Sequence, residues 1–399
     1  MRIRHPICAF ALVVTAAACG HTSAPSLRAA VGSTSDGSGS LPDNAALVAD
    51  SSLVVGSQTY RLGATAGAPL TGSLVPLAVP SPSGDRYLYN SWAQGADEQC
   101  TGDPSQRGNC KEPARDAIIG RPTLRVFTPS SGQDVVVEPG AVSAAWRPDG
   151  AVAYFKGNAT DVPADTSRFV GHLYVRDSLD AAPARWTTDA ARYVAVGWAG
   201  STLIAYRQSD GERFDVLALS GPGAVRTVAS DATVVAVSPD GTQLLVNHDR
   251  DETSTASVVP VSGGAPLGTI DLAKTTDPQS GSPLAWITYG GSWDGELVAA
   301  ESALGVALFR VSSGRISFDR VLAAKGSDYS MGIHEPQLFR DKSGKQRLIA
   351  WAPVSAPTKS GRASAILTCD VGAKSCARNG TRNERSVGLA RANGHGRAT

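Results

Sequence analysis

The stretch Val237-Ser238-Pro239-Asp240-Gly241-Thr242-Gln243-Leu244-Leu245-Val246 decides the fold, because weaker copies of it recur through most of the chain. Two apolar runs flank a Ser-Pro-Asp-Gly turn, in which proline presets φ, aspartate tolerates the third position and glycine closes the turn. The stretch therefore predicts one strand, a tight turn and a second strand. A repeat of this kind fixes the architecture before any single residue is interpreted.

Six copies of this inner hairpin follow one another along the chain. They span residues 77–89, 144–155, 194–206, 234–246, 286–300 and 337–351. Each is followed by an outer hairpin of two alternating strands. The outer hairpins span residues 124–137, 172–187, 214–228, 256–270, 306–321 and 365–377. Four strands per unit, repeated at roughly 40 to 60 residues, predict an all-β propeller of six four-stranded blades.

The composition supports short strands joined by turns. The 399 residues include 42 Gly and 24 Pro but only 2 Met, and Val, Thr and Ser fill the periodic segments. The formal net charge is +1, so there is no global attraction to nucleic acid. We therefore expect no nucleic-acid partner, and we expect a monomer.

The hairpins Trp146-Arg147-Pro148-Asp149-Gly150 and Ser238-Pro239-Asp240-Gly241 resemble the repeats of TolB-type propellers. With the outer hairpins, the resemblance covers most of residues 75–379, and it implies interaction with envelope proteins. TolB also carries an N-terminal α/β domain, for which residues 20–75 are too short. Only the propeller fold and the habit of protein binding therefore carry over.

A ring of seven blades is the alternative to six, because only two of the six copies keep Pro-Asp-Gly intact. A seventh blade would involve residues 53–62. We expect this early hairpin instead to supply an edge strand that closes the ring against the last blade, since closure removes an exposed sheet edge. The propeller would then span residues 47–379.

The N-terminus has the features of a targeting segment. Arg2 and Arg4 precede an apolar stretch at 7–14 that is too short to span a bilayer, and Ala16-Ala17-Ala18-Cys19-Gly20 follows. This resembles a bacterial lipobox, which implies a cleaved signal peptide at 1–18, acyl chains including palmitate on Cys19 and anchoring at the extracytoplasmic face of the cell membrane. Ala16 stands where the family usually has Leu, so an ordinary secretion signal is the alternative.

Two segments flank the predicted propeller. Residues 19–46 are rich in Ser, Gly, Ala and Thr, which predicts a flexible tether. Residues 380–399 contain four Arg against one Glu and have no apolar periodicity, which predicts a basic, disordered tail. Contact with an anionic surface is the alternative for that tail.

Four cysteines remain beyond Cys8 and Cys19, and an even number in an exported chain predicts disulfides. The close spacing favours Cys100 with Cys110 and Cys369 with Cys376 over the other two pairings. Binding of a metal by the thiols is the alternative, although neither pair has the two-residue spacing of a zinc knuckle.

Function is expected on one face of the ring. In a propeller, the loops that lead into the innermost strands and those that join second to third strands share a face, and the hairpin turns lie opposite. The long polar loops on the first face are 90–121, 156–169, 207–213, 247–255, 273–283, 323–335 and 352–362. Such loops are uncommon unless functional or disordered. We predict that they bind envelope or secreted proteins, with candidate residues Trp92, Lys156, Arg207, His248, Asp249, Asp251, Tyr329, His334 and Glu335.

Two polar groups could carry chemistry. The run from Asn247 to Glu252 is the densest in the folded region, and His334-Glu335 leads into the last inner strand near the axial channel. A solvated loop would explain the first group without a function, and a strand-capping histidine would explain the second. No nucleophile or phosphate-binding motif is present. We predict no catalytic residue and no cofactor.

Two other classes remain open as alternatives. One is a propeller hydrolase, lyase or lactonase with a divalent metal in the channel, for which histidines and carboxylates must converge. The other is a sensor of carbohydrates or small molecules, for which Trp92 and Tyr329 should cluster.

Two further residue types have structural explanations. Three aspartates occupy inner turns for backbone reasons. They are Asp149, Asp240 and Asp294. Three tryptophans near the ends of inner strands are expected to pack between blades. They are Trp146, Trp198 and Trp286.

Overall fold

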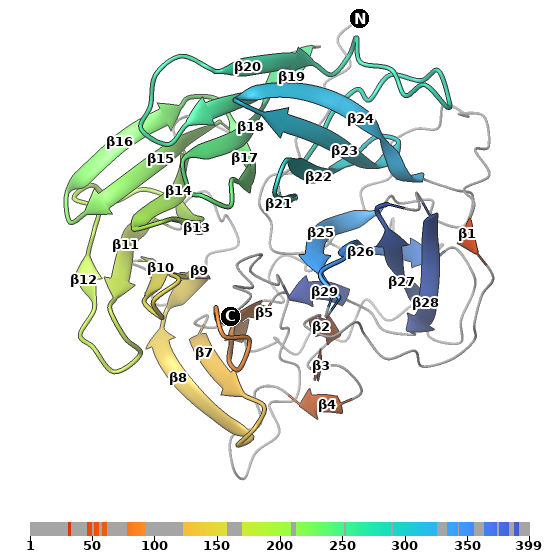
Figure 1. The fold of residues 1–399 in the computed structure, drawn as a ribbon. Helices are drawn as coiled ribbons and strands as arrows, with labels where there is room; N and C mark the ends of the chain where they lie inside the picture. The colour runs from red at the N-terminus through yellow and green to blue at the C-terminus, as the bar shows by residue number, and fades with distance from the viewer. Residues whose placement is uncertain are drawn as a thin grey trace, which may run out of the picture.

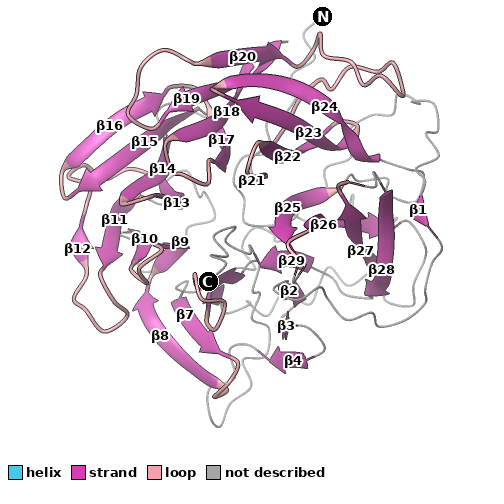
Figure 2. Cartoon of the chain, viewed as in Figure 1, coloured by secondary structure: helices cyan, strands magenta, loops and turns pink. Residues whose placement is uncertain are grey.

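The structure is a computed structural model. It describes residues 31–32, 46–49, 52–55, 58–61, 78–91, 123–157, 170–208, 213–250, 253–288, 290–324, 333–341, 343–354, 363–372, 375–382 and 387–390. Every regular element in these ranges is a β-strand (Figure 2). Within them, no helix is long and apolar enough to cross a membrane.

Six sheets follow the predicted repeat and surround a common axis (Figure 1), with strands in chain order from the axis outward. Blade 1 consists of β5 (Ala78–Pro80), β6 (Tyr87–Ser91), β7 (Thr123–Thr128) and β8 (Gln133–Pro139). Blade 2 consists of β9 (Ala141–Trp146), β10 (Val152–Gly157), β11 (Gly171–Arg176) and β12 (Ala184–Arg185). Blade 3 consists of β13 (Tyr193–Ala199), β14 (Thr202–Gln208), β15 (Phe214–Gly221) and β16 (Ala224–Ala229).

Blades 4 to 6 repeat the same order. Blade 4 consists of β17 (Thr233–Val237), β18 (Gln243–Arg250), β19 (Thr253–Pro260) and β20 (Gly268–Asp271). Blade 5 consists of β21 (Ser292–Asp294), β22 (Leu297–Ser302), β23 (Gly305–Ser312) and β24 (Arg315–Ala324). Blade 6 consists of β25 (His334–Arg340), β26 (Gln346–Val354), β27 (Ala363–Asp370) and β28 (Ser375–Arg382). The all-β propeller and its six repeat units are therefore confirmed.

A seventh sheet is assembled from both ends of the described chain. Blade 7 has the order β29 (Val387–Ala390), β2 (Ala46–Ala49), β3 (Ser52–Val55) and β4 (Gln58–Arg61). Its inner strand β29 lies against β5 of blade 1 and β26 of blade 6. The ring is thus closed by hydrogen bonds between the two ends of the chain.

This closure corrects two expectations. The hairpin within 53–62 does not extend the last blade, because β3 and β4 pair inside blade 7, in agreement with the seven-blade alternative. The strand that extends blade 6 is β1 (Val31–Gly32), which belongs to the predicted tether and pairs in parallel with β28. Residues 387–390, expected in a disordered tail, form β29, and a four-residue strand is too short for its periodicity to be recognised in the sequence.

The hydrophobic core lies between neighbouring blades. In one cluster, Leu297 and Leu308 of blade 5 pack with Leu338, Leu348 and Leu367 of blade 6. Equivalent clusters join blades 1 and 2, 2 and 3, 3 and 4, and 4 and 5. Burial of one sheet face against the next is the source of stability in stacked repeats.

Tryptophans clasp successive blades, as predicted for two of the three positions. Trp146 Nε1 donates to the Val79 carbonyl at 3.0 Å, and Trp198 Nε1 donates to the Ala145 carbonyl at 3.3 Å. The guanidinium of Arg147 lies 5.1 Å from the Trp198 ring, which is a cation–π distance. Trp286 is 38% exposed, so its predicted packing between blades is wrong.

Two of the three turn aspartates, Asp149 and Asp240, accept backbone N–H groups within their turns. Asp149 Oδ1 accepts the Ala151 N–H at 3.1 Å, and Asp240 Oδ1 accepts the Thr242 N–H at 3.0 Å. Asp294 also reaches the next blade, where it accepts a hydrogen bond from Gln346 at 2.8 Å. These carboxylates are therefore used within the turns and between adjacent blades.

The predicted bridge between Cys369 and Cys376 is present. The two residues are direct partners in the antiparallel pair of β27 and β28. The bridge therefore ties together the two outermost strands of the blade 6 repeat beside their turn.

Candidate functional site

The propeller presents two different faces. On the first, here named the loop face, each innermost strand begins; on the second, the turn face, each innermost strand ends in its turn. His334 is the first residue of β25, so it lies on the loop face. The turn that follows Arg340, with its Gly344 N–H to Asp341 carbonyl bond of 2.8 Å, lies on the turn face.

His334 meets a neighbouring blade at the loop face. Its Nδ1 lies 3.0 Å from Oε1 of Glu301, near the end of β22 in blade 5. The His334 and Glu301 side chains are only 25% and 16% exposed. At this distance a protonated Nδ1 donates to the carboxylate, and a second proton on the imidazole turns the hydrogen bond into an ion pair.

Trp351 and Glu335 complete this group. Trp351 lies directly across the ladder from His334, and the two ring centroids are 4.6 Å apart. Its Nε1 donates to Oε2 of Glu335 at 3.1 Å. We name His334, Glu301, Glu335 and Trp351 the blade 5–6 junction.

The backbone of the blade 5–6 junction is irregular. Glu335 has a φ of 50°, which is uncommon for a residue with a side chain. The register shifts between His334 and Gln337, and Pro336 in this bulge has no N–H for the ladder. Bulges re-aim side chains and are frequent beside functional sites.

Ser292 of blade 5 fixes the bulge from outside. Its Oγ donates to the Pro336 carbonyl at 3.1 Å and accepts the Leu338 N–H at 2.6 Å. A residue in such a sparsely populated conformation costs about 1–3 kcal/mol and persists only where its surroundings determine it. The hydrogen bonds from Ser292 and Trp351 hold Glu335 in this conformation.

The blade 5–6 junction therefore combines an imidazole, two carboxylates and an indole. With a neutral imidazole, the two carboxylates give the group a charge of −2, which complements hydrogen-bond donors and cationic groups of a partner. Among the residues that the structure describes, no three His, Cys, Asp or Glu side chains are grouped so that they could hold a metal ion.

Lys156, another candidate, belongs to a partly buried ionic cluster at the loop-face end of β10. Its Nζ lies 2.5 Å from Oε1 of Glu138, while Arg176 donates to Oε2 at 2.7 Å and the Tyr154 hydroxyl donates to it at 3.1 Å. Burial acts to raise the pKa of Glu138, but the bonds from Lys156 and Arg176 outweigh it, so the pKa lies below its usual value. Burial raises the pKa of Tyr154 to about 12. Lys156 thus stabilises the contact between blades 1 and 2.

Arg207, a further candidate, forms ion pairs with two aspartates. It lies on β14 and donates to Oδ2 of Asp215 at 3.1 Å, with Asp189 at 3.7 Å. The hydrogen bond that Arg207 donates to Asp215 is the main cause that raises the pKa of Arg207. Its ion pairs link β14 to β15 and to the segment before β13.

The prediction of a long loop at 247–255 is wrong. β18 and β19 remain paired as far as Arg250 opposite Thr253, because strand pairing uses the backbone and tolerates a polar run. His248 and Asp249 therefore lie on β18, and His248 Nδ1 is 3.2 Å from the Asp231 carbonyl. His248 is not part of the blade 5–6 junction.

Several predictions lie outside the described residues. These are the candidates Trp92, Asp251 and Tyr329, the lipidation site Cys19, and the pair Cys100 and Cys110. Most residues of the loops 90–121, 156–169, 323–335 and 352–362 also lie outside them.

The sequence did not single out Glu301 or Trp351. Glu301 ends a regular strand of another blade, and only the packing of blade 5 against blade 6 places it beside His334. Trp351 ends a predicted inner hairpin, but the regular register from the turn would place Ala352 opposite His334, and the bulge shifts this pairing to Trp351.

Comparison with known proteins supports the architecture. Neither a family model nor a curated protein matches the sequence. Prolyl oligopeptidase B from Galerina marginata is similar in structure, with a TM-score of 0.50 and 12% identity over 84% of this chain and 45% of that one. TolB from Acinetobacter baumannii has a TM-score of 0.39 and 14% identity over 68% of this chain and 61% of that one. The acylaminoacyl peptidase from Pyrococcus horikoshii has a TM-score of 0.45 and 13% identity over 76% and 44%.

The chain thus spans less than two thirds of each of these three proteins. At 12% identity, the likeness to prolyl oligopeptidase B shows the fold alone, in agreement with the β-propeller described above.

Proposed function

We propose that the chain is an extracytoplasmic propeller that binds envelope or secreted proteins through its loop face and is held at the membrane by lipid on Cys19. The observation that carries the proposal is the blade 5–6 junction, where His334 meets Glu301 and Trp351 holds Glu335 on the loop face. The TolB-type hairpins at 146–150 and 238–241 support the role of a periplasmic-type scaffold.

The blade 5–6 junction has the properties of a contact site. Its polar atoms are fixed before a partner arrives, because Ser292 and Trp351 hold the bulge, and a preorganised surface loses less entropy on binding. Tryptophan is enriched where protein interfaces derive their energy. The carboxylates of Glu301 and Glu335 favour a partner segment that contains Arg or Lys.

Photo-crosslinking in intact cells tests which face binds. A photoreactive residue replaces Val170, which precedes β11 on the loop face, or Val225, which follows the outer turn of blade 3 on the turn face. The two side chains are matched, with exposures of 37% and 38%. We expect protein adducts from position 170 and not from position 225. Equal adducts from both positions, or adducts from position 225 alone, would contradict the proposal.

The lipid anchor is tested separately. The change Cys19→Ala removes the thiol that would be acylated, and we expect the protein to leave the membrane fraction, since a tether without acyl chains has no apolar anchor. A Cys8→Ala variant, which changes a cysteine inside the predicted signal peptide, should remain with the membranes. Unchanged fractionation of the Cys19→Ala protein would refute anchoring through this residue.

A further inference from the structure

Strand direction determines the face on which the predicted tether joins the propeller. Four residues separate the end of β28 from the start of β29, and this connection extends at most roughly 17 Å. β28 itself is eight residues long, or about 26 Å, so β29 must begin on the loop face, where β28 ends. β2 is antiparallel to β29. Ala46 therefore lies on the turn face, and the chain reaches blade 7 from that side.

β1 lies on the same side of the molecule. Val31 pairs with Cys376 and Gly32 with Ala377, at the start of β28 and directly after the outer turn of blade 6. In Figure 1, β1 lies at the rim of the ring beside β28. Residues 20–30 extend at most roughly 40 Å, so an anchor at Cys19 stays within that distance of the turn-face rim of blade 6.

This part of the turn face is cationic in sequence. The turn of blade 6, Arg340-Asp341-Lys342-Ser343-Gly344-Lys345-Gln346-Arg347, has four cations and one carboxylate, which gives +3. The corresponding segments of blades 1, 2 and 3, from the last residue of one strand to the second residue of the next, are 80–88, 146–153 and 199–203, and each has a net charge of zero. Those of blades 4 and 5, at 237–244 and 294–298, have −1 and −2. Blade 6 therefore differs from the other five repeats.

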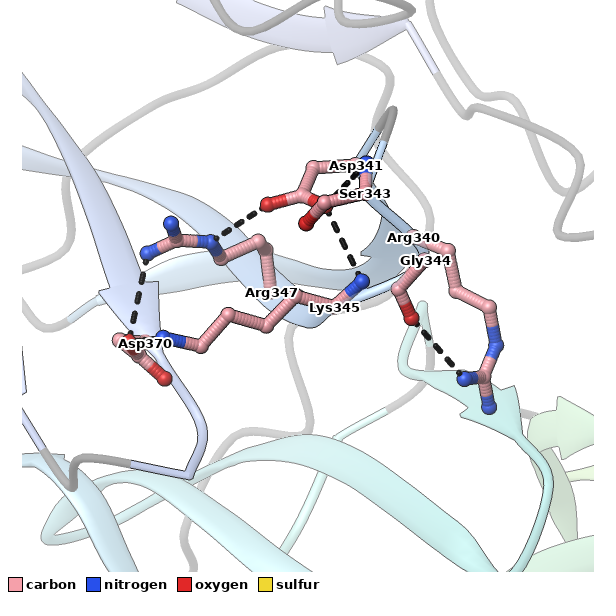
Figure 3. Close-up of polar contacts among 7 residues, drawn as sticks. All are labelled: Arg340, Asp341, Ser343, Gly344, Lys345, Arg347 and Asp370. Carbon is pink, nitrogen blue, oxygen red and sulfur yellow. Dashed lines mark hydrogen bonds and ion pairs between the residues drawn. The ribbon is translucent and has the colours of Figure 1, made fainter.

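The ion pairs place these cations outermost. Arg340 is 55% exposed and its partner Asp294 15%, while Lys345 is 48% exposed and its partner Asp370 14%. Figure 3 shows Lys345 and Arg347 converging on Asp370 beside the turn. In blade 5, Arg310 likewise covers Asp319. The carboxylates thus lie beneath the positive groups.

Blades 1 and 2 show the reverse arrangement. Asp85 is 57% exposed beside Arg86 at 36%, and Asp149 is 61% exposed beside Arg147 at 18%. Within these ion pairs, the carboxylate is the more exposed partner on blades 1 and 2 and the cation is the more exposed partner on blades 5 and 6. The turn of blade 5 also carries the exposed Glu296, so the excess of positive charge is concentrated on blade 6. The predicted tether reaches the cationic side.

We propose that the turn face of blades 5 and 6 contacts the anionic lipid headgroups of the membrane through Arg310, Arg340, Lys345 and Arg347. The location of this contact rests on the lipid anchor of the proposed function, whereas the exposed charge does not. Basic groups next to an anionic surface each strengthen membrane binding, and acyl chains plus a basic patch form a two-signal anchor. The loop face then points away from the membrane, toward partners.

Vesicle binding tests the patch without the lipid. The chain from residue 20 onward retains every strand of the structure, and its partition is measured on vesicles of phosphatidylglycerol with phosphatidylcholine and on phosphatidylcholine alone. The double variant Arg340→Gln/Lys345→Gln should lose roughly 30-fold in partition to the acidic vesicles. The matched control Arg213→Gln/Lys274→Gln removes two exposed cations near the loop face and should bind as the unchanged chain does. Binding should weaken as salt shortens the Debye length.

Three results would overturn the proposal. They are equal binding of the unchanged chain to acidic and neutral vesicles, equal losses in both double variants, and binding to soluble polyglutamate without binding to vesicles. The last would assign the patch to an acidic protein. Because neither acylation nor the loop face enters this assay, its failure is separate from failure of the proposed function, which the crosslinks and Cys19→Ala report.

Discussion

Replacing Trp198 by Phe should destabilise the ring by about 2–4 kcal/mol. The change withdraws the indole donor from the Ala145 carbonyl, and a hydrogen bond of this kind contributes about 0.5–1.5 kcal/mol. The smaller ring leaves a cavity worth about 1 kcal/mol. It also weakens the contact with Trp186, whose ring centroid is 5.7 Å away, and the cation–π contact with Arg147.

Urea unfolding measures this loss as a lower midpoint at unchanged slope. Trp286→Phe is the matched control, because it is the same chemical change at a side chain that is 38% rather than 7% exposed. We expect the control to remain within about 0.5 kcal/mol of the unchanged chain. If the two variants unfold together, the tryptophan does not clasp blades 2 and 3, and the reasoning from hydrogen bond, cavity and ring contacts is refuted.

Two further changes test the ionic cluster and the disulfide. Glu138→Gln should lower the unfolding free energy at neutral pH by about 2 kcal/mol, less than the 3–5 kcal/mol of a fully buried pair, because its partner Lys156 is 40% exposed. Since the folded pKa of Glu138 is lowered, its contribution to stability is complete above the ordinary glutamate pKa and is lost as pH falls through the folded value. The unfolding free energy of the variant should therefore decline less than that of the unchanged chain when both are titrated into the acid range. Equal declines in the two proteins would count against the cluster. Cys369→Ala/Cys376→Ala should lower stability by about 2 kcal/mol in denaturant titrations, because the bridge closes a short loop of seven-residue separation. An unchanged midpoint for the double variant would show that the bridge adds nothing to the paired strands around it.

The sequence could predict elements whose signal is local. The inner and outer hairpins of six blades follow from turn chemistry within about a dozen residues, as at Ser238–Gly241. Blade 7 could not be predicted in this way, because β29 pairs with β2 across almost the whole chain and a strand pattern does not name its partner. Trp286 was misplaced for a related reason: β21 begins only at Ser292, so the buried indole of that blade is Trp293.

The candidate site was half predictable for the same physical reason. His334 and Glu335 could be identified because they precede a predicted inner strand. Glu301 and Trp351 join them through blade packing and strand register, which depend on contacts that no local pattern encodes. The bulge at Glu335 has one local signal, the proline that follows it, since a residue without an N–H is rarely placed inside a regular ladder.

Closure and anchoring share one sheet, and this has a mechanical consequence. β2 is the strand that the predicted tether enters, and it is held between β29 and β3. A pull from the membrane on Ala46 therefore acts along β2 and loads its hydrogen bonds to both neighbours in shear, so that they resist together rather than one after another. A closure by a single edge strand would bear the same pull on one ladder alone. Blade 7 thus joins strands from both ends of the described chain at the point where a membrane tether would apply its load.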